Sequence, residues 1–461
     1  GRGGSGISAL VSILLGGAVT LGVLVWLGRL ACDGWPQAAG DPAEQRPVMR
    51  TAERSSTAVR NRAGRSGAAE GTGSAGRSGA AEGSGSVGDG GGGRSSQEPS
   101  VGPEHQASRR RFFTITAALG GAAALGTGIA TWLRSNAAVA TERMGLRLPN
   151  ALNPLPPVPA GVSVDLDGVA PFMTPNADFY RIDTAFVVPK VSIEDWTLRV
   201  HGLVQREVSL DFASLLERPM IELDATIACV SNEVGGGLVG TARWLGCRLD
   251  DLLGEAGIDP SADQVVGRSI DGFTAGFPTA ALDGRDAMVA VGMNGEPLPT
   301  DHGYPARLIV PGLYGYVSAT KWLTEIELTR FDAFEGYWIP RGWDRDAPVQ
   351  TSSRIDTPRG GAEVAAGEPV GIGGVAWAMN RGIDRVEVQV DDGAWQEAML
   401  GEQLSGTTWR QWRHSVSLDP GEHRIAVRAS DTDGVTQSGT RLPPGPNASS
   451  GWHTISVVAR T

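Results

Sequence analysis

The sequence predicts an α+β protein, in which a mixed α/β domain is followed by an antiparallel β-sandwich and preceded by transmembrane helices and a disordered linker. Three observations predict this order: apolar spans at residues 7–30 and 108–135, a polar glycine-rich tract between them, and regular alternation of apolar and polar residues after residue 350. The formal net charge of −11 argues against a nucleic-acid-binding protein, which needs clustered cations to bind phosphates.

The N-terminal spans predict membrane anchoring. Residues 7–30 are long enough to cross a bilayer core of about 30 Å. In residues 108–135 three arginines precede an apolar stretch, which is similar to a twin-arginine export signal, although a plain transmembrane helix with a basic flank has the same pattern. Both interpretations put the chain after Ser135 outside the cytoplasm, with the anchor retained. The near-duplicate segments GRSGAAEG at 64 and 76 lie in a tract too polar to fold.

The middle of the chain mixes strand and helix patterns. Residues 196–204 alternate as a half-buried strand does, and Ile221 to Val230 form an apolar strand. Residues 211–217 and 248–257 are short helix candidates. The interleaving shows no regular βαβ spacing, which favours a mixed α+β domain.

The C-terminal residues predict a sandwich of about 110 residues, immunoglobulin-like in size. Val386, Val388 and Val390 alternate with polar residues, and Asp-Gly and Pro-Gly pairs mark the turns. Its tryptophans are expected in the core, with a binding patch as the alternative: Trp377, Trp395, Trp409, Trp412 and Trp452. The predicted organisation is a transmembrane helix (1–32), a disordered linker (33–107), a signal-anchor helix (108–135), an extended proline-rich spacer (136–175), the α+β domain (176–350) and the sandwich (351–461).

A cysteine at a strand end is the first candidate for chemistry. Cys229 ends the apolar strand and precedes a loop with glycines at 235–237 and 240, as a soft-metal thiolate site would require. The alternative is a disulfide with Cys247, which an exported domain would tolerate. Cys247 also alternates with leucines, as a small core residue does.

A second group of candidates lies in residues 293–323. His302, Arg307 and Lys321 follow one another through a turn, the strand ARLIVP and a glycine-broken loop. Each is suited to donate hydrogen bonds to a phosphate or a heteroaromatic ligand, and each singly is as well explained by a solvated surface.

The two groups together make the chain resemble the molybdenum-cofactor domain of the sulfite oxidase family. The matching pieces are NADFYRIDT, ATIACVSN, GTARWLGCRLDDLL, DGFTAGFP and MNGEPLPTDHGYPARLIVPGLYG, in this order. The C-terminal segments GVAWA, VEVQVDDGAW and GWH are similar to that family's dimerisation domain, so the resemblance covers about residues 176–461 and implies a homodimer.

The resemblance implies a role for each matching residue. Cys229 would be the single protein ligand to molybdenum, whose other sulfurs belong to molybdopterin. The implied cofactor-binding residues are Asn176, Tyr180, Arg181, Thr274, His302, Arg307, Ser318 and Lys321. Arg181 is also a candidate to attract substrate, as are Arg243 and Arg341.

Two departures from the family concern the substrate. Sulfite oxidases place an arginine shortly after the metal cysteine, where this chain reads Ser231, Asn232, Glu233. Their tyrosine downstream of the lysine corresponds here to Trp343, or is displaced to Tyr337. A carboxylate near the site would weaken the binding of an anion.

The sequence therefore predicts a membrane-anchored, extracytoplasmic molybdopterin oxidoreductase that performs two-electron oxygen-atom transfer on an oxyanion such as sulfite. The alternatives are a sulfoxide reductase on the same cofactor and a non-catalytic surface adhesion module. The six histidines include no CxxCH haem motif, so a separate electron carrier, such as a cytochrome or another membrane redox partner, is expected.

Overall fold

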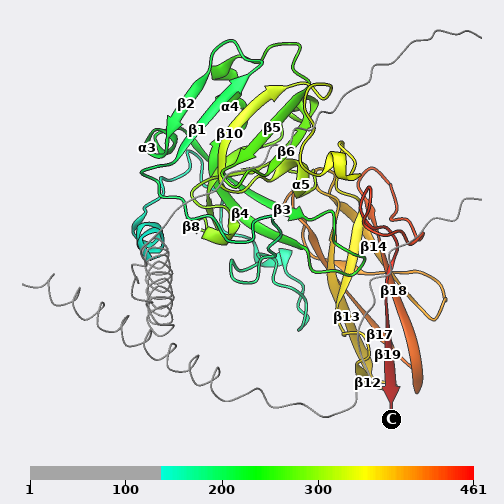
Figure 1. Ribbon diagram of the computed structural model, residues 1–461. Coiled ribbons are helices and arrows are strands. Elements are labelled where there is room, and N and C mark those ends of the chain that lie inside the picture. The colour runs from blue at the N-terminus through cyan, green and yellow to red at the C-terminus, as the bar shows by residue number, and fades with distance from the viewer. Residues whose placement is uncertain (1–136) are drawn as a thin grey trace, which may run out of the picture. The chain divides into compact units, whose positions relative to one another are not determined.

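The computed structural model describes residues 137–461 (Figure 1). The predicted transmembrane helices and the linker lie outside the described residues. Within residues 137–461, no helix is both long and apolar enough to span a bilayer.

The proline-rich segment packs against the domain, so the prediction of an extended spacer is wrong for residues 137–175. Residues 137–145 are helical, and the irregular chain after them hydrogen-bonds to a strand of the domain, through Leu152 N to Met220 O (2.9 Å) and Leu155 N to the Glu222 carboxylate (2.7 Å). Val162 and Phe172 are buried in the main core. Ordered structure therefore begins well before Asn176, because donors between the prolines find partners on the domain.

One five-stranded sheet has the order β2-β1-β10-β5-β6. Its strands are β1 (Thr197–Gly202), β2 (Val208–Asp211), β5 (Gln264–Ser269), β6 (Thr274–Pro278) and β10 (Leu323–Thr329). The pair β1–β10 is parallel and the other pairs are antiparallel. In β1, buried Leu198 and Val200 alternate with exposed Thr197 and Arg199, as the pattern predicts.

Both predicted helices are confirmed. The helix α3 (Phe212–Leu216) begins at Asp211, whose carboxylate accepts a hydrogen bond from Ser214 N (2.8 Å). The helix α4 (Leu249–Ala256) buries its residues at positions 249, 252, 253 and 256, the period of one helical face. Gly257, with φ 69°, ends it. Shorter helices are η1 (Ala160–Val162), η2 (Thr279–Ala281), η3 (Thr300–His302), α5 (Gly315–Ser318) and η4 (Ile339–Arg341).

A second sheet carries the cysteines. Its order is β3-β4-β7-β8, with β9 also paired to β7: β3 (Met220–Ala228), β4 (Val239–Arg248), β7 (Met288–Met293), β8 (Glu296–Pro297) and β9 (Arg307–Ile309). The β3–β4 ladder pairs Met220 with Cys247 and Ala228 with Val239. The two cysteines therefore lie at opposite ends of this hairpin, about 30 Å apart at the usual rise per residue. Both are free thiols, so the disulfide alternative is wrong.

The C-terminal residues form two further sheets around a shared core (Figure 1). Their strands are β11 (Ser352–Thr357), β12 (Glu363–Ala365), β13 (Pro369–Trp377), β14 (Ile383–Val390), β15 (Gln396–Glu397), β16 (Met399–Leu400), β17 (Arg410–Ser417), β18 (Gly421–Asp431) and β19 (His453–Arg460). The orders are β11-β13-β17-β16 and β12-β19-β18-β14-β15. Ile372 and Trp412 from the first sheet pack with Val386, Val427 and Val457 from the second. The predicted strands are thus present as two packed sheets, antiparallel except for the parallel pair β12–β19.

The tryptophans of these sheets follow the core prediction in part. Trp412 is buried in the core between the two sheets, as predicted. Trp377 and Trp409 are also buried, but in the main core with residues of the N-terminal sheets. Trp395 and Trp452 are half-buried and pack edge to face on each other, with ring centroids 4.8 Å apart.

The edge strand β3 is covered by the loop before β17. Thr226 N donates to Thr407 O (2.9 Å), Trp409 N donates to Thr226 Oγ1 (2.8 Å), and Thr407 Oγ1 donates to Asp224 O (2.7 Å). The strand that leads to Cys229 is therefore fixed from both sides.

Candidate active site

The strand β3 delivers Cys229 to a pocket. Cys229 follows Ala228 directly, its backbone N donates to Leu238 O (2.9 Å), and the Asn232 side chain accepts from Leu238 N (2.8 Å), which closes the loop. The thiol is 8% exposed, and its Sγ accepts a hydrogen bond from Ser231 N (3.4 Å). Burial raises the pKa of the Cys229 thiol, so at neutral pH this sulfur becomes a thiolate only if a bound cation replaces the proton.

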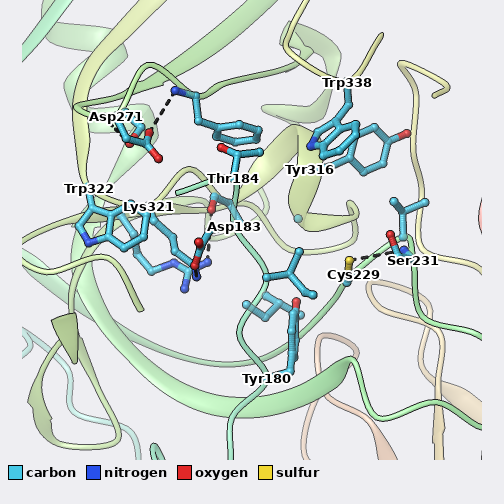
Figure 2. Close-up of a pocket in the computed structure, with 18 of the residues that line it drawn as sticks. Tyr180, Asp183, Thr184, Cys229, Ser231, Asp271, Tyr316, Lys321, Trp322 and Trp338 are labelled. Carbon is cyan, nitrogen blue, oxygen red and sulfur yellow. Dashed lines mark hydrogen bonds and ion pairs between the residues drawn. The ribbon is translucent and has the colours of Figure 1, made fainter. Parts of the chain in front are cut away.

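The pocket around this sulfur is lined by aromatic and charged side chains (Figure 2). Its aromatic residues are Phe179, Tyr180, Phe273, Tyr316, Trp322, Trp338 and Trp343. Its charged residues are Asp183, Asp271, Arg307 and Lys321. In Figure 2 Lys321, Trp322 and Asp183 lie together, and Cys229 lies across the pocket from them.

Arg307, from β9, is a buried cation without a carboxylate partner in the part of the chain that the structure describes. It is 3% exposed, and its guanidinium donates to His302 O (3.1 Å) and Ala319 O (3.3 Å), while Nε has no hydrogen-bond partner. Burial lowers the pKa of Arg307 to about 10. A buried guanidinium with an unused donor is what an anionic ligand would complete.

Lys321 adds a second buried positive charge. Its Nζ lies 3.0 Å from Asp183 Oδ2 and 3.0 Å from Asp301 O. Burial, together with the nearby Arg307, lowers the pKa of Lys321 to about 8. Asp183 also accepts a hydrogen bond from Arg181 Nε (2.9 Å), so one carboxylate holds two cations.

Three other predicted residues line an adjoining hollow. Asn176, Arg181 and His302 face this hollow, and Phe179 borders both spaces. His302 is 4% exposed, and its Nε2 lies 3.2 Å from Asn176 O. Burial, and then the charge of Arg307, lowers the pKa of His302 to about 4, so the ring is neutral at neutral pH.

Comparison with known proteins agrees with this arrangement. The family model described as "Oxidoreductase molybdopterin binding domain" matches residues 185–338. Chicken (Gallus gallus) sulfite oxidase is 30% identical, with 59% of this chain and 69% of that protein covered. The chain belongs to the sulfite oxidase family.

Other relatives extend the comparison. Mouse (Mus musculus) mitochondrial sulfite oxidase is 32% identical over 59% of this chain and 58% of that protein. The chain spans 58% and 62% of the length of the mouse and human enzymes that it matches. The solved sulfane dehydrogenase SoxCD of Paracoccus pantotrophus shares the fold, with a TM-score of 0.55 and 24% identity over 64% of this chain and 85% of that one.

The residues of this sulfite oxidase family member fit a molybdopterin cofactor. No group of three or more His, Cys, Asp or Glu side chains that could hold a metal occurs within residues 137–461. A metal with a single thiolate from the protein would therefore take its other ligands from a cofactor, and Arg307 and Lys321 offer buried positive charge to an anionic one. The matched domain is thus an oxidoreductase domain that binds molybdopterin.

Several candidates from the sequence lie away from the Cys229 pocket. Ser318 Oγ donates to Leu313 O (3.2 Å) and Tyr314 O (3.0 Å), and Thr274 Oγ1 accepts from Tyr337 N (3.1 Å), so both hydroxyls serve the backbone. Gly240 lies in β4, where the missing Cβ makes room for a protein side chain, because a Cβ there would lie 2.9 Å from the Phe179 ring.

The candidate substrate arginines are also engaged elsewhere. Arg243 forms a two-pronged ion pair with Asp224, with both contacts at 2.8 Å. Arg341 packs over the ring of Tyr337 at 3.7 Å. Glu233, whose charge was expected to repel an anion, is exposed and does not line the Cys229 pocket.

Several residues that line the pocket were not predicted from the sequence. Asp183 and Asp271 lie inside the matched pieces NADFYRIDT and DGFTAGFP, so their place in these motifs could have marked both as pocket residues. Tyr316 and Trp338 carried no comparable signal, because the pocket brings them together from separate elements, α5 and the start of η4.

Proposed function

We propose that the chain catalyses two-electron oxygen-atom transfer on a small sulfur–oxygen substrate, with Cys229 as the single protein ligand to molybdenum. The observation that carries this proposal is the Cys229 thiol in the same pocket as the Arg307 guanidinium, which has no anionic partner among the described residues. A soft sulfur ligand beside an unsatisfied cation suits an anionic metal cofactor.

Different residues of the chain would bind different parts of the cofactor. Arg307 and Lys321 would hold the anionic groups of the cofactor, and neutral His302 would donate or accept a hydrogen bond at its heteroaromatic part. By family resemblance Asn176, Tyr180, Arg181, Thr274 and Ser318 complete the binding set. The bound cofactor supplies the electron-pair chemistry of oxygen-atom transfer, and the chain binds, orients and shields it from water.

Two substrate classes are candidates, one suggested by the relatives and one by the pocket lining. An oxyanion such as sulfite is favoured by the name of the mammalian and chicken enzymes. A sulfoxide is the alternative, because the pocket lining carries as many carboxylates, Asp183 and Asp271, as cations.

The test is metal analysis combined with spectroscopy on the full chain, made in a host that synthesises the cofactor. We expect close to one molybdenum per chain, and a molybdenum spectrum that changes when sulfite reduces it or a sulfoxide reoxidises it. Less than about half a molybdenum per chain would favour the adhesion module instead.

The location, partners and assembly of the enzyme are further parts of the proposal. The apolar spans at 7–30 and 108–135 support a membrane anchor with the enzyme outside the cytoplasm, where a cytochrome or another membrane redox protein would exchange electrons. The C-terminal sandwich, proposed to be of immunoglobulin type, would form a two-fold homodimer. Membrane fractionation, protease accessibility in spheroplasts and the mass in detergent test these points separately.

A further inference from the structure

The pocket has an aromatic side formed by Tyr316, Trp338 and Trp343, which we name the aromatic wall. The Tyr316 and Trp343 ring centroids are 5.8 Å apart, and those of Trp338 and Trp343 are 6.3 Å apart at an interplanar angle of 78°. In Figure 2 Tyr316 and Trp338 appear in the same part of the pocket, apart from Lys321 and Trp322.

The chain holds this wall in place through its backbone. The helix η4 and Gly342, at φ 92°, turn the chain so that Trp343 N donates to Trp338 O (3.4 Å). The Tyr316 hydroxyl donates to Asp344 O, so its hydrogen-bonding capacity is directed to the backbone and its ring lines the pocket. The wall is therefore a preformed apolar surface.

The pocket has few cations that could bind an anionic substrate. Among the described lining residues the cations are Arg307 and Lys321, and under the proposed function both would be engaged by the cofactor. Arg181 is tied to Asp183 and does not line this pocket. A small oxyanion beside the wall would lose its hydration without meeting a free cation, whereas an uncharged molecule would not.

We propose that the aromatic wall selects an uncharged sulfoxide with an apolar substituent, R–S(=O)–R′, over a small oxyanion. This inference rests on the proposed function. The S–O bond breaks, the oxygen leaves as water, and the sulfur keeps the electron pair: R₂SO + 2 H⁺ + 2 e⁻ gives R₂S + H₂O. The electrons come from a reduced one-electron carrier, represented in an assay by reduced viologen, and the protons come from solvent. The substituent R packs on the indole rings.

The test compares two sulfoxides that differ in their apolar group. The full-length holoenzyme is assayed with methyl phenyl sulfoxide and dimethyl sulfoxide, using reduced viologen, and with sulfite, using ferricyanide as oxidant. We expect kcat/KM for methyl phenyl sulfoxide to exceed that for dimethyl sulfoxide by about tenfold or more, since apolar pockets discriminate on this scale. Sulfite should be the poorest of the three substrates.

Variants connect this preference to the wall. Trp343→Leu should remove most of the preference, mainly through KM for the phenyl compound, at unchanged molybdenum content. Trp395→Leu, on the C-terminal sheets, should leave the substrate preference unchanged. Calorimetric binding of methyl phenyl sulfone, which retains the apolar group, should weaken in Trp343→Leu by a similar factor.

Three results would overturn the inference. Sulfite turnover above that of both sulfoxides would refute it and leave the proposed oxygen-atom transfer intact. Equal losses for both sulfoxides in Trp343→Leu would show that the wall has only a structural role. A molybdenum-loaded enzyme that turns over none of the three would refute both proposals.

Discussion

The guanidinium carbon of Arg307 lies 5.2 Å from the ring centroid of Trp244. Both side chains are buried, and within residues 137–461 no acidic side chain forms an ion pair with this arginine. An isolated buried cation costs folding free energy, which is recovered only when an anion binds. The arrangement favours ligand binding at the expense of the stability of the empty protein.

Replacing Arg307 should therefore lower cofactor binding without lowering the stability of the cofactor-free protein. Arg307→Met is expected to lower the pterin content about tenfold or more, while the unfolding free energy of the cofactor-free protein stays equal or rises by about 1 kcal/mol. The control Arg243→Met leaves the Asp224 carboxylate buried and unpaired, and should cost about 3 kcal/mol. Released pterin fluorescence and denaturant unfolding measure the two effects. A large loss of stability in Arg307→Met would contradict the proposed role.

Replacing the proposed metal ligand should abolish turnover without unfolding the chain. Cys229→Ser substitutes a hard, protonated oxygen for a soft sulfur, so we expect activity to fall about a thousandfold, within the usual range for an essential group. Cys247→Ala is the matched control, because Cys247 is buried in β4 far from the pocket. It should cost about 1 kcal/mol of stability and keep activity. Near-normal turnover in Cys229→Ser would refute the ligand assignment.

His302 should contribute a pH dependence to stability in the acid range. Its folded pKa is about 4, below the ordinary value of 6.5, so between these values the unfolded chain binds more protons than the folded one. Stability then rises with pH through this window, and falls by about 3 kcal/mol as pH drops through it. His302→Gln should flatten the curve relative to the wild type. Parallel curves in urea titrations between pH 4 and pH 7 would show that His302 does not cause the dependence.

Lys321 should set an alkaline limit on cofactor binding. With a pKa of about 8 in the ligand-free chain, Lys321 loses its charge as pH rises through that value. Binding of molybdopterin to the apoprotein should weaken about tenfold per pH unit above this point, as expected for one ionisation. Lys321→Arg keeps its charge and should remove the limit. Fluorescence titration of the two proteins at pH 7 and pH 9 makes the comparison, and the same loss in both would exclude Lys321 as the cause.

The Trp409 side chain should be a main contact between the segment that contains Phe172 and the C-terminal sheets. It is 2% exposed, and its Nε1 donates to Phe172 O (2.8 Å). Trp409→Leu should cost about 3 kcal/mol, because it removes buried area and leaves a polar group without its partner. The control Trp395→Leu, at a half-buried position, should cost about 1 kcal/mol. Thermal unfolding distinguishes them, and equal costs would contradict the assignment.

Local patterns in the sequence were sufficient to predict the regular elements and the place of Cys229 at a strand end. The period of α4 and the alternation of β1 are properties of neighbouring residues, and Cys229 stands at the end of a recognisable apolar strand. The family motifs located Tyr180, Arg307 and Lys321 on the same pocket.

Features that depend on tertiary contacts could not be predicted in the same way. The packing of residues 137–175 depends on partners such as Met220 and Glu222, and a proline-rich sequence has the same composition whether or not it finds them. The hydrogen bonds that the Thr274 and Ser318 hydroxyls form with the backbone could not be predicted either. A hydroxyl that bonds to the backbone and one that binds a ligand look identical in sequence.

The contact of Thr226 with Thr407 has a consequence for dissecting the protein. Cutting the chain near residue 350 would remove Thr407, the backbone partner of Thr226, and leave the edge strand β3 uncovered. A bare strand edge recruits other chains, so the N-terminal fragment should aggregate when it is expressed alone. A catalytic fragment therefore needs to retain the C-terminal sheets through β19.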